Sequence, residues 1–318
     1  MLSGKNTVPV FLALFAVLLL AGCQAQTGDT ADETIVGGET AGDEADDSGS
    51  VETGSDKGTI SFGLPPWPGV TVKTAVVKQI LEEKGYTVES NELDAGIVYA
   101  SLAQGDLDVL LAGWLPVTHK DYWEQHGDNL EKVRVNVDET WLGLAVPTYV
   151  YEDGVTSIND LNENVDLFDG QIIGIEPGAG IMQSTEEVMD TYSLDDYELV
   201  SSSTPSMMAE VDASVRQEEP VVFTIWEPHS AFAKFDIKKL DDPEEIYGGG
   251  DVVYTITRDG FSDEYPEVYS FLENFEVTPD TQSEWILEYS DKEREPEAVA
   301  EEWISNNQDK VNQWWPES

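Results

Sequence analysis

The sequence predicts an α/β protein built from two similar lobes that face each other across a cleft. Short apolar strands alternate with helical patterns along the chain, which favours mostly parallel sheets. The succession strand, break, helix, strand, helix, buried strand occurs once before residue 115 and begins again at Gln171. The last strand of each half ends in a tryptophan, Trp114 or Trp226, and a proline follows two residues later. Two units built to one plan predict two lobes with a cleft between them.

The first half is punctuated by proline and glycine. Alternation typical of a strand stops at a proline-rich break, and from Val70 the apolar positions repeat with helical spacing as far as Gly85. The expected elements are a strand over residues 57–63, a break at 65–69, a helix over 70–85, a strand over 87–90, a helix around 97–102 and a buried strand over 107–112.

The second half repeats this order. Its expected elements are a strand over residues 171–175, a turn at 176–180, a helix over 181–191, a strand over 198–200, a helix over 207–217 and an apolar strand over 220–225. From Phe261 onward the pattern is helical, and we expect this tail to pack on the first lobe. The predicted division is lobe I over residues 58–147, lobe II over 148–253, and a return to lobe I over 254–318.

The N-terminus indicates export. Residues 1–22 have the apolar run of a signal peptide, too short to span a bilayer comfortably. Leu20-Ala21-Gly22-Cys23 resembles the lipobox of bacterial lipoproteins, so Cys23 is predicted to carry a lipid anchor at the extracellular face of the membrane or in the periplasm. The alternative is a plain secretory signal with a stray cysteine. As the only cysteine in the chain, Cys23 leaves no disulfide and no thiolate metal site.

The charge balance is strongly acidic. The chain has 64 Asp and Glu against 16 Lys and Arg, a net charge of -48. Such a surface repels nucleic acid and anionic lipid headgroups. Residues 23–57 lack aromatic side chains and predict an acidic flexible tether. The excess of acid along the whole chain favours a halophilic surface, where salt screens self-repulsion, over an ordinary acidic secreted protein.

Three tryptophans lie where strands are expected to end, which is the edge of an open α/β sheet that binds ligands. They are Trp67, Trp114 and Trp226. A quaternary ammonium has no N–H to donate, so the faces of aromatic rings are what can select its diffuse positive charge. The alternative for each indole is core packing. Of the other tryptophans, Trp141 is ambiguous, and the rest sit in helical patterns that predict packing: Trp123, Trp285, Trp303, Trp314 and Trp315.

Several local motifs give the chain a family resemblance over residues 58–310. It resembles the glycine betaine-binding proteins of osmoprotectant ABC importers, in which an aromatic prism surrounds the trimethylammonium group. The motifs that carry the resemblance are Gly113-Trp114-Leu115-Pro116-Val117-Thr118-His119, Gly174-Ile175-Glu176-Pro177-Gly178-Ala179-Gly180-Ile181-Met182, Trp226-Glu227-Pro228-His229, Leu240-Asp241-Asp242-Pro243 and Tyr254-Thr255-Ile256-Thr257-Arg258. The resemblance implies a type II periplasmic-binding-protein fold.

The resemblance also implies a set of ligand-binding residues. Trp67, Trp114 and Trp226 would form the prism. The amides of Gly180 and Ile181 would lie at a helix N-terminus, which favours a carboxylate. His119 would add a side-chain hydrogen bond, and its alternative is a capping or surface histidine. The competing interpretation of residues 178–180 is a nucleotide fingerprint, but Gln183 stands where a third glycine is needed.

The implied function is capture of glycine betaine by a monomeric binding lipoprotein that serves an ABC permease and its ATPase, with no cofactor and no metal. Choline, proline betaine and carnitine share the cationic head, and a receptor without transport has the same fold. Catalysis is disfavoured because the chain lacks G-x-S-x-G, H-E-x-x-H and a cysteine nucleophile. We expect the lobes to hinge around residues 145–149 and 252–257.

Overall fold

Residues 57–315 are described by a computed structural model of the chain. The predicted signal peptide, Cys23 and nearly all of the predicted tether lie outside these residues. No helix between residues 57 and 315 combines the length and apolar character that a membrane span requires.

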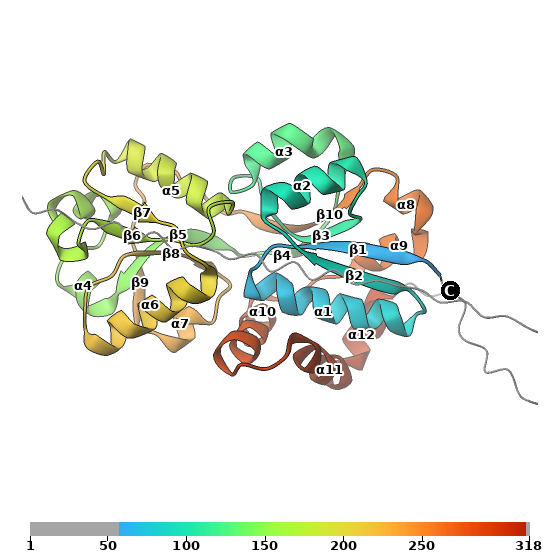
Figure 1. Cartoon of the computed structure of the whole chain (residues 1–318). Helices are drawn as coiled ribbons and strands as arrows, with labels where there is room; N and C mark the ends of the chain where they lie inside the picture. Colours follow the sequence, from blue (N-terminus) through green and yellow to red (C-terminus); the bar gives the residue numbers. More distant parts are fainter. Residues whose placement is uncertain (1–56, 316–318) are drawn as a thin grey trace, which may run out of the picture. The chain divides into compact units, whose positions relative to one another are not determined.

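The first sheet has the strand order β2-β1-β3-β10-β4 (Figure 1). Its strands are β1 (Thr59–Leu64), β2 (Thr87–Glu92), β3 (Val109–Leu115), β4 (Leu130–Val137) and β10 (Val252–Arg258). β1 pairs in parallel with β2 and β3, whereas β10 runs antiparallel to β3 and β4. Every residue of β3 is buried, as expected for a central strand that is covered on both faces.

The second sheet repeats this plan with the order β7-β6-β8-β5-β9. Its strands are β5 (Trp141–Pro147), β6 (Gln171–Ile173), β7 (Glu198–Val200), β8 (Phe223–Glu227) and β9 (Ile237–Lys239). β6 pairs in parallel with β7 and β8, and β5 runs antiparallel to β8 and β9. β3 and β8 therefore hold equivalent places, and their C-terminal ends present Trp114 and Trp226 in the same way.

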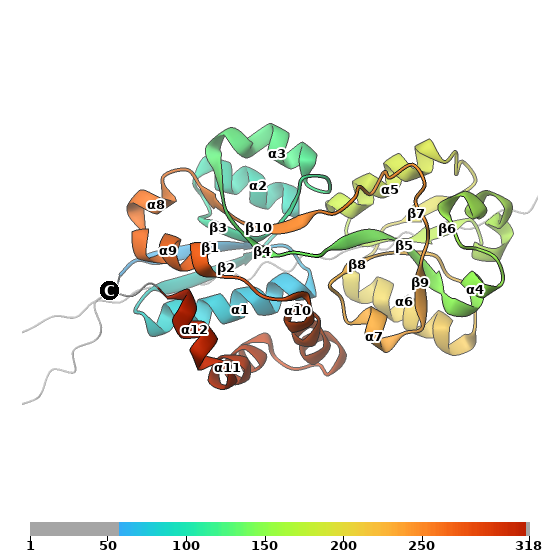
Figure 2. The ribbon, with the colours of Figure 1, turned by 180° about the vertical axis from the view of Figure 1, so that it is seen from behind.

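The chain crosses between the sheets twice, after β4 and before β10 (Figure 2). These crossings comprise residues 138–140 and 240–251, and the hydroxyl of Thr140 donates to the carbonyl of Asp251 at 2.5 Å. The sequence predicted the first boundary at residue 147 and a hinge at 145–149. Instead β5 lies wholly in the second sheet, because Trp141 to Ala145 pair with β8. An apolar strand pattern does not reveal which sheet the strand joins.

Helices cover both faces of each sheet. In Figure 1, α1 lies on one face of the first sheet with α2 and α3 on the other, and α5 and α6 lie on opposite faces of the second sheet. In lobe I these helices are α1 (Pro68–Glu83), α2 (Ala95–Gln104), α3 (Lys120–His126) and η1 (Gly127–Asn129). In lobe II they are α4 (Thr148–Glu152), η2 (Ile158–Glu163), η3 (Val165–Phe168), α5 (Gly180–Thr191), α6 (Thr204–Gln217) and α7 (Ala231–Lys234).

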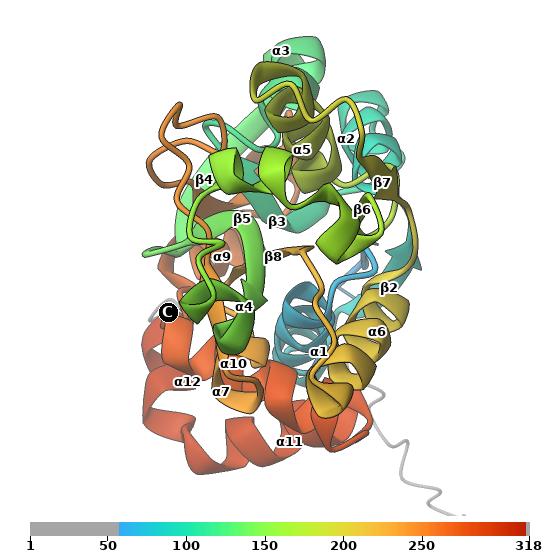
Figure 3. The ribbon, with the colours of Figure 1, turned by 90° about the vertical axis from the view of Figure 1, so that its left-hand side faces the viewer.

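The C-terminal helices pack on lobe I, with α10 and α11 against α1 (Figure 3). They are α8 (Phe261–Glu264), α9 (Pro266–Asn274), α10 (Pro279–Ile286), η4 (Leu287–Asp291), α11 (Pro296–Asn306) and α12 (Gln308–Trp314). Several begin with proline, whose fixed φ suits the first turn of a helix. The ring centroids of Trp285 and Trp303 lie 5.1 Å apart and Trp303 stacks on Trp314 at 5.5 Å, so Trp285 and Trp314 are buried in the core and Trp303 packs against it, as predicted.

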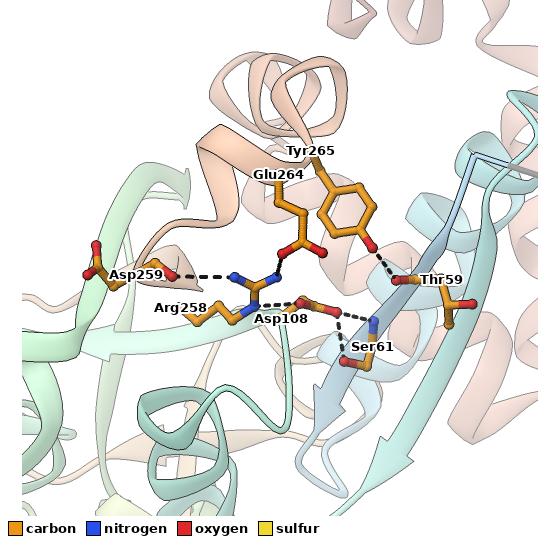
Figure 4. A network of polar contacts seen from close by, with 7 residues as sticks. All are labelled: Thr59, Ser61, Asp108, Arg258, Asp259, Glu264 and Tyr265. Carbon is orange, nitrogen blue, oxygen red and sulfur yellow. Dashed lines mark hydrogen bonds and ion pairs between the residues drawn. The ribbon is translucent and has the colours of Figure 1, made fainter.

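A polar network joins β10 and α8 to β1 and to Asp108, the residue before β3 (Figure 4). The guanidinium of Arg258 bonds Asp108 at 2.7 Å and Glu264 at 2.5 Å. Asp108 also accepts hydrogen bonds from the amide and the hydroxyl of Ser61, both at 2.8 Å. The side chains of Arg258 and Asp108 are only 16% and 12% exposed, so solvent screens their interaction weakly.

We expect Arg258→Met to lower the free energy of unfolding by about 1–3 kcal/mol, because it leaves the half-satisfied carboxylate of Asp108 without its charged partner. The matched control is Lys120→Met, which removes an exposed pair with Glu124 at 3.9 Å and should cost about 0–1 kcal/mol. Denaturant unfolding of both variants measures the difference. Equal losses in the two variants would show that the network does not stabilise the lobe.

Candidate functional site

A cavity lies between the two lobes, and all six residues predicted to bind ligand line it. Its volume is about 40 Å³, and it is partly open to solvent. The predicted residues in its lining are Trp67, Trp114, His119, Gly180, Ile181 and Trp226. The structure therefore brings together residues that are up to 159 positions apart in the sequence.

The three tryptophans reach the cavity from equivalent strand ends. Trp114 and Trp226 are the penultimate residues of β3 and β8, and Trp67 is the N-cap residue of α1, three positions after the end of β1. Their exposed fractions are 8% or less, so the indoles are almost fully removed from water. Rings in such a dry setting interact with a cation more strongly than exposed rings do.

The N-terminus of α5 faces the cavity from lobe II. Gly180 and Ile181 are the first two residues of this helix, so their amides have no partner four residues earlier and carry its positive dipole end. In lobe I the equivalent position after β1 carries Trp67 followed by Pro68, which has no N–H. The same point of the two lobes thus offers an aromatic ring on one side and free amides on the other.

His119 presents a donor to the same region. Its Nδ1 accepts the amide N–H of Trp114 at 3.2 Å and lies 3.2 Å from the hydroxyl of Tyr99. The neutral ring therefore carries its proton on Nε2. This Nε2 is buried and has no hydrogen-bond partner within residues 57–315. A Cβ placed on Gly180 would lie 2.9 Å from the adjacent Cδ2, so the free Nε2–H sits beside the start of α5.

The turn that carries His119 is held by hydrogen bonds to Asp251, at the end of the second crossing between the sheets. The carboxylate of Asp251 accepts the amides of Val117 at 2.6 Å and Thr118 at 3.0 Å. Asp251 is itself buried. Because Asp251 precedes β10, the returning chain holds the turn between Trp114 and α3 in place.

Contacts between the lobes flank the cavity. From α3, the hydroxyl of Tyr122 donates to the carbonyl of Gly178 at 2.9 Å and accepts from Gln183 at 2.6 Å. Elsewhere, Lys234 of α7 pairs with Asp291 of η4 at 2.6 Å. The lobes are therefore closed on each other, with charged and polar contacts that join residues of both.

Burial lowers the pKa of His119 to about 3 and that of His229 to about 4. Both imidazoles are thus neutral in the folded protein, while the unfolded chain takes up a proton on each near pH 6.5. The contribution of each neutral histidine to the free energy of unfolding is fully present above pH 6.5. As the pH drops below 6.5, this contribution decreases by about 1.4 kcal/mol per pH unit until the folded-state pKa is reached.

We therefore expect His119→Gln to flatten the acid limb of the stability curve. Between pH 6.5 and pH 5 the wild type should lose about 2 kcal/mol more free energy of unfolding than the variant. Denaturant titrations at constant high salt measure this difference, with His126→Gln as the control, because His126 lies in the partly exposed α3. Parallel curves for wild type and His119→Gln would mean that His119 is protonated in the folded state.

Some residues near the cavity were not predicted. Lys73 and Gln282 line it and are 1% and 3% exposed. The Nζ of Lys73 donates to Asn136 at 2.7 Å and to the carbonyl of Leu111 at 3.2 Å. Lys73 lies four positions after Gly69 on the buried face of α1, so helical periodicity could have identified it.

Two residues that the sequence left open lie outside this cavity. Trp141 packs against Phe232 at 6.2 Å and under the ammonium of Lys239 at 4.6 Å, and it is not part of the lining. The rings of His229 and Trp226 are nearly perpendicular, with their centroids 5.0 Å apart, so His229 packs against that indole.

Comparison with known proteins gives one family. Its description is the substrate-binding domain of ABC-type glycine betaine transport systems, and it matches residues 58–306. The glycine betaine/carnitine transport binding protein GbuC of Listeria monocytogenes is 41% identical over 157 residues, which are 49% of this chain and 51% of GbuC. The chain thus matches about half the length of this relative.

Solved structures resemble a larger part of the chain. Lactococcal OpuAC, in a closed conformation with glycine betaine, has a TM-score of 0.76 and 31% identity, covering 81% of this chain and 99% of that one. A choline-binding protein of an ABC transporter, in complex with choline, has a TM-score of 0.76 and 29% identity over 80% of this chain and 91% of its own. The predicted fold of two α/β lobes, of the periplasmic-binding-protein kind, is confirmed.

Proposed function

The chain belongs to the family of substrate-binding domains of ABC-type glycine betaine transport systems, and on that premise we propose that it captures glycine betaine and delivers it to a membrane permease. The observation that supports this proposal is the cavity itself, whose lining includes three buried indoles and the first two residues of α5. One end suits a methylated cation and the other suits a carboxylate.

At the cationic end, Trp67, Trp114 and Trp226 would surround the trimethylammonium group. Each desolvated cation–π contact contributes roughly 0.5–2 kcal/mol. At the other end, the amides of Gly180 and Ile181 and the Nε2–H of His119 would bind the carboxylate, at roughly 1.5–3 kcal/mol for each hydrogen bond to a charged group. Binding costs about 4 kcal/mol or more in lost translational and rotational freedom of the ligand. The binding free energy that remains after this cost is consistent with roughly micromolar affinity.

The carboxylate end favours a betaine over choline, because choline offers two amides and an imidazole only a neutral hydroxyl oxygen in place of a carboxylate. Proline betaine and carnitine keep both groups and remain ligands of the same class. We assign no catalytic step to the cavity. Among residues 57–315, no group of three or more His, Cys, Asp or Glu side chains is placed to hold a metal ion.

The exported setting completes the proposal. Cys23 would carry the lipid anchor and residues 23–57 the tether, so that a monomer reaches its permease and ATPase from the outer face of the membrane. Closure would rotate the lobes about the crossings at residues 138–140 and 240–251, since only these segments join the sheets within the described chain. A lobe arrangement in solution scattering that does not respond to ligand would count against this.

Tryptophan fluorescence of the protein, titrated with glycine betaine and with choline in molar salt, tests the proposal. A saturable change at micromolar glycine betaine is expected, because indoles that line the cavity would contact the ligand. Circular dichroism establishes that the protein is folded. If a folded protein responds to neither ligand, the quaternary-ammonium assignment is wrong.

A further inference from the structure

Lys73 gives the cavity an unexpected charge. Within the described chain, the lining contains no Asp or Glu, and Lys73 is its one side chain of formal charge. The whole protein has 64 acids against 16 Lys and Arg, so a lining without an acid departs sharply from its composition. A site that selected its ligand by positive charge alone would be expected to include a carboxylate.

The ammonium of Lys73 is also held without a countercharge. Its hydrogen-bond acceptors are the neutral carbonyl of Leu111 and the amide oxygen of Asn136. Asn136 is fixed in turn by Thr255, to which its amide donates at 3.0 Å. β3 and β4 therefore each place a neutral oxygen on a lysine that is 1% exposed, and β10 holds the Asn136 side chain in position.

Resting on the function proposed above, we propose that Lys73 makes the site selective for zwitterions by rejecting ligands of net positive charge. A buried cation repels choline, which has no carboxylate to offset the repulsion. Glycine betaine brings one negative and one positive charge into the same field, so most of the interaction cancels. Because Lys73 is buried, this discrimination persists at high salt, where screening removes the attraction of the acidic outer surface for cations.

The same lysine should make the discrimination depend on pH. Burial lowers the pKa of Lys73 to about 7, so its ammonium is charged below pH 7 and increasingly neutral above it. Two titratable groups beside the cavity, His119 and Tyr99, do not change charge in this range. Burial lowers the pKa of His119 to about 3 and raises that of Tyr99 far above its usual value. Asp251, before β10, is bound by two amides, and Gln282 of α10 is neutral.

The test compares choline and glycine betaine affinities, by calorimetry in molar salt, for wild type, Lys73→Met and the control Lys78→Met. Lys78 lies on the same helix, away from the cavity lining, and pairs with Glu82 at 3.9 Å. We expect Lys73→Met to lower the ratio of the choline Kd to the glycine betaine Kd at least tenfold at pH 6, and Lys78→Met to leave it unchanged. In the wild type, choline affinity should rise about tenfold from pH 6 to pH 8.5, while in Lys73→Met it stays flat.

The outcomes separate the two proposals. A wild type that binds glycine betaine, with a ratio that neither pH nor Lys73→Met alters, overturns the role of Lys73 and leaves the proposed function intact. A wild type that binds neither ligand overturns both. If Lys73→Met does not fold, the pH series on the wild type decides alone: a flat choline affinity contradicts the inference.

Discussion

Replacing Trp114 by alanine should weaken glycine betaine binding by about 100-fold. The variant loses one desolvated cation–π contact of up to about 2 kcal/mol and the apolar contact of an indole that is 7% exposed, together about 3 kcal/mol or two decades in Kd. Choline affinity should fall by a similar factor, because the two ligands share the trimethylammonium group. Calorimetric titration of both ligands measures the loss.

Two controls separate loss of the cage from loss of the fold. Trp141→Ala removes an indole of the second sheet that lies outside the cavity lining, so its affinity should stay within about twofold of wild type. Trp114→Phe keeps an aromatic face on β3 and should lose less affinity than alanine. If Trp114→Ala is folded and binds as tightly as wild type, the ammonium group does not lie against this ring.

The sequence predicted the lobes because hydrophobic periodicity and glycine or proline breaks are local signals. The elements from residue 59 to 115 and from 171 to 227 were found in the right order, with ends displaced by a few residues. What local pattern could not supply was the partner of each strand. β5 pairs antiparallel with β8 in the second sheet, and β10 pairs antiparallel with β3 in the first sheet. Tertiary contacts decide both pairings.

The residues of the cavity lining were predicted where motifs lie at strand ends, and missed where a residue lies within an element. Trp67 is flanked by prolines, and Trp114 and Trp226 each lie two positions before a proline, so a chain break marks all three. Helical periodicity marks Lys73 as lying on the buried face of α1, but its hydrogen-bond partner Asn136 is 63 positions away and no local signal joins the two. Asp251 is one acid among many, and only the folded chain brings it to the amides of Val117 and Thr118.

Gly180→Ala should abolish tight binding without unfolding the protein. A Cβ on Gly180 would lie 2.3 Å from the carbonyl oxygen of Thr118 and 2.6 Å from its Cγ2, so lobe II could no longer approach lobe I this closely. Losing two hydrogen bonds to the carboxylate, at roughly 1.5 kcal/mol or more each, raises the Kd for glycine betaine by about 100-fold. Folding stability should hold or rise, since alanine suits a helix better than glycine.

Stability and affinity thus move apart in this variant, which distinguishes a blocked closure from a damaged fold. Gly249→Ala is the matched control, because a Cβ there meets no atom within 4 Å, and its affinity should equal that of wild type. Scattering with saturating glycine betaine should leave Gly180→Ala more open than wild type. If Gly180→Ala instead closes fully and binds at wild-type affinity, the contact between α5 and Thr118 is not the one that brings the amides to the ligand.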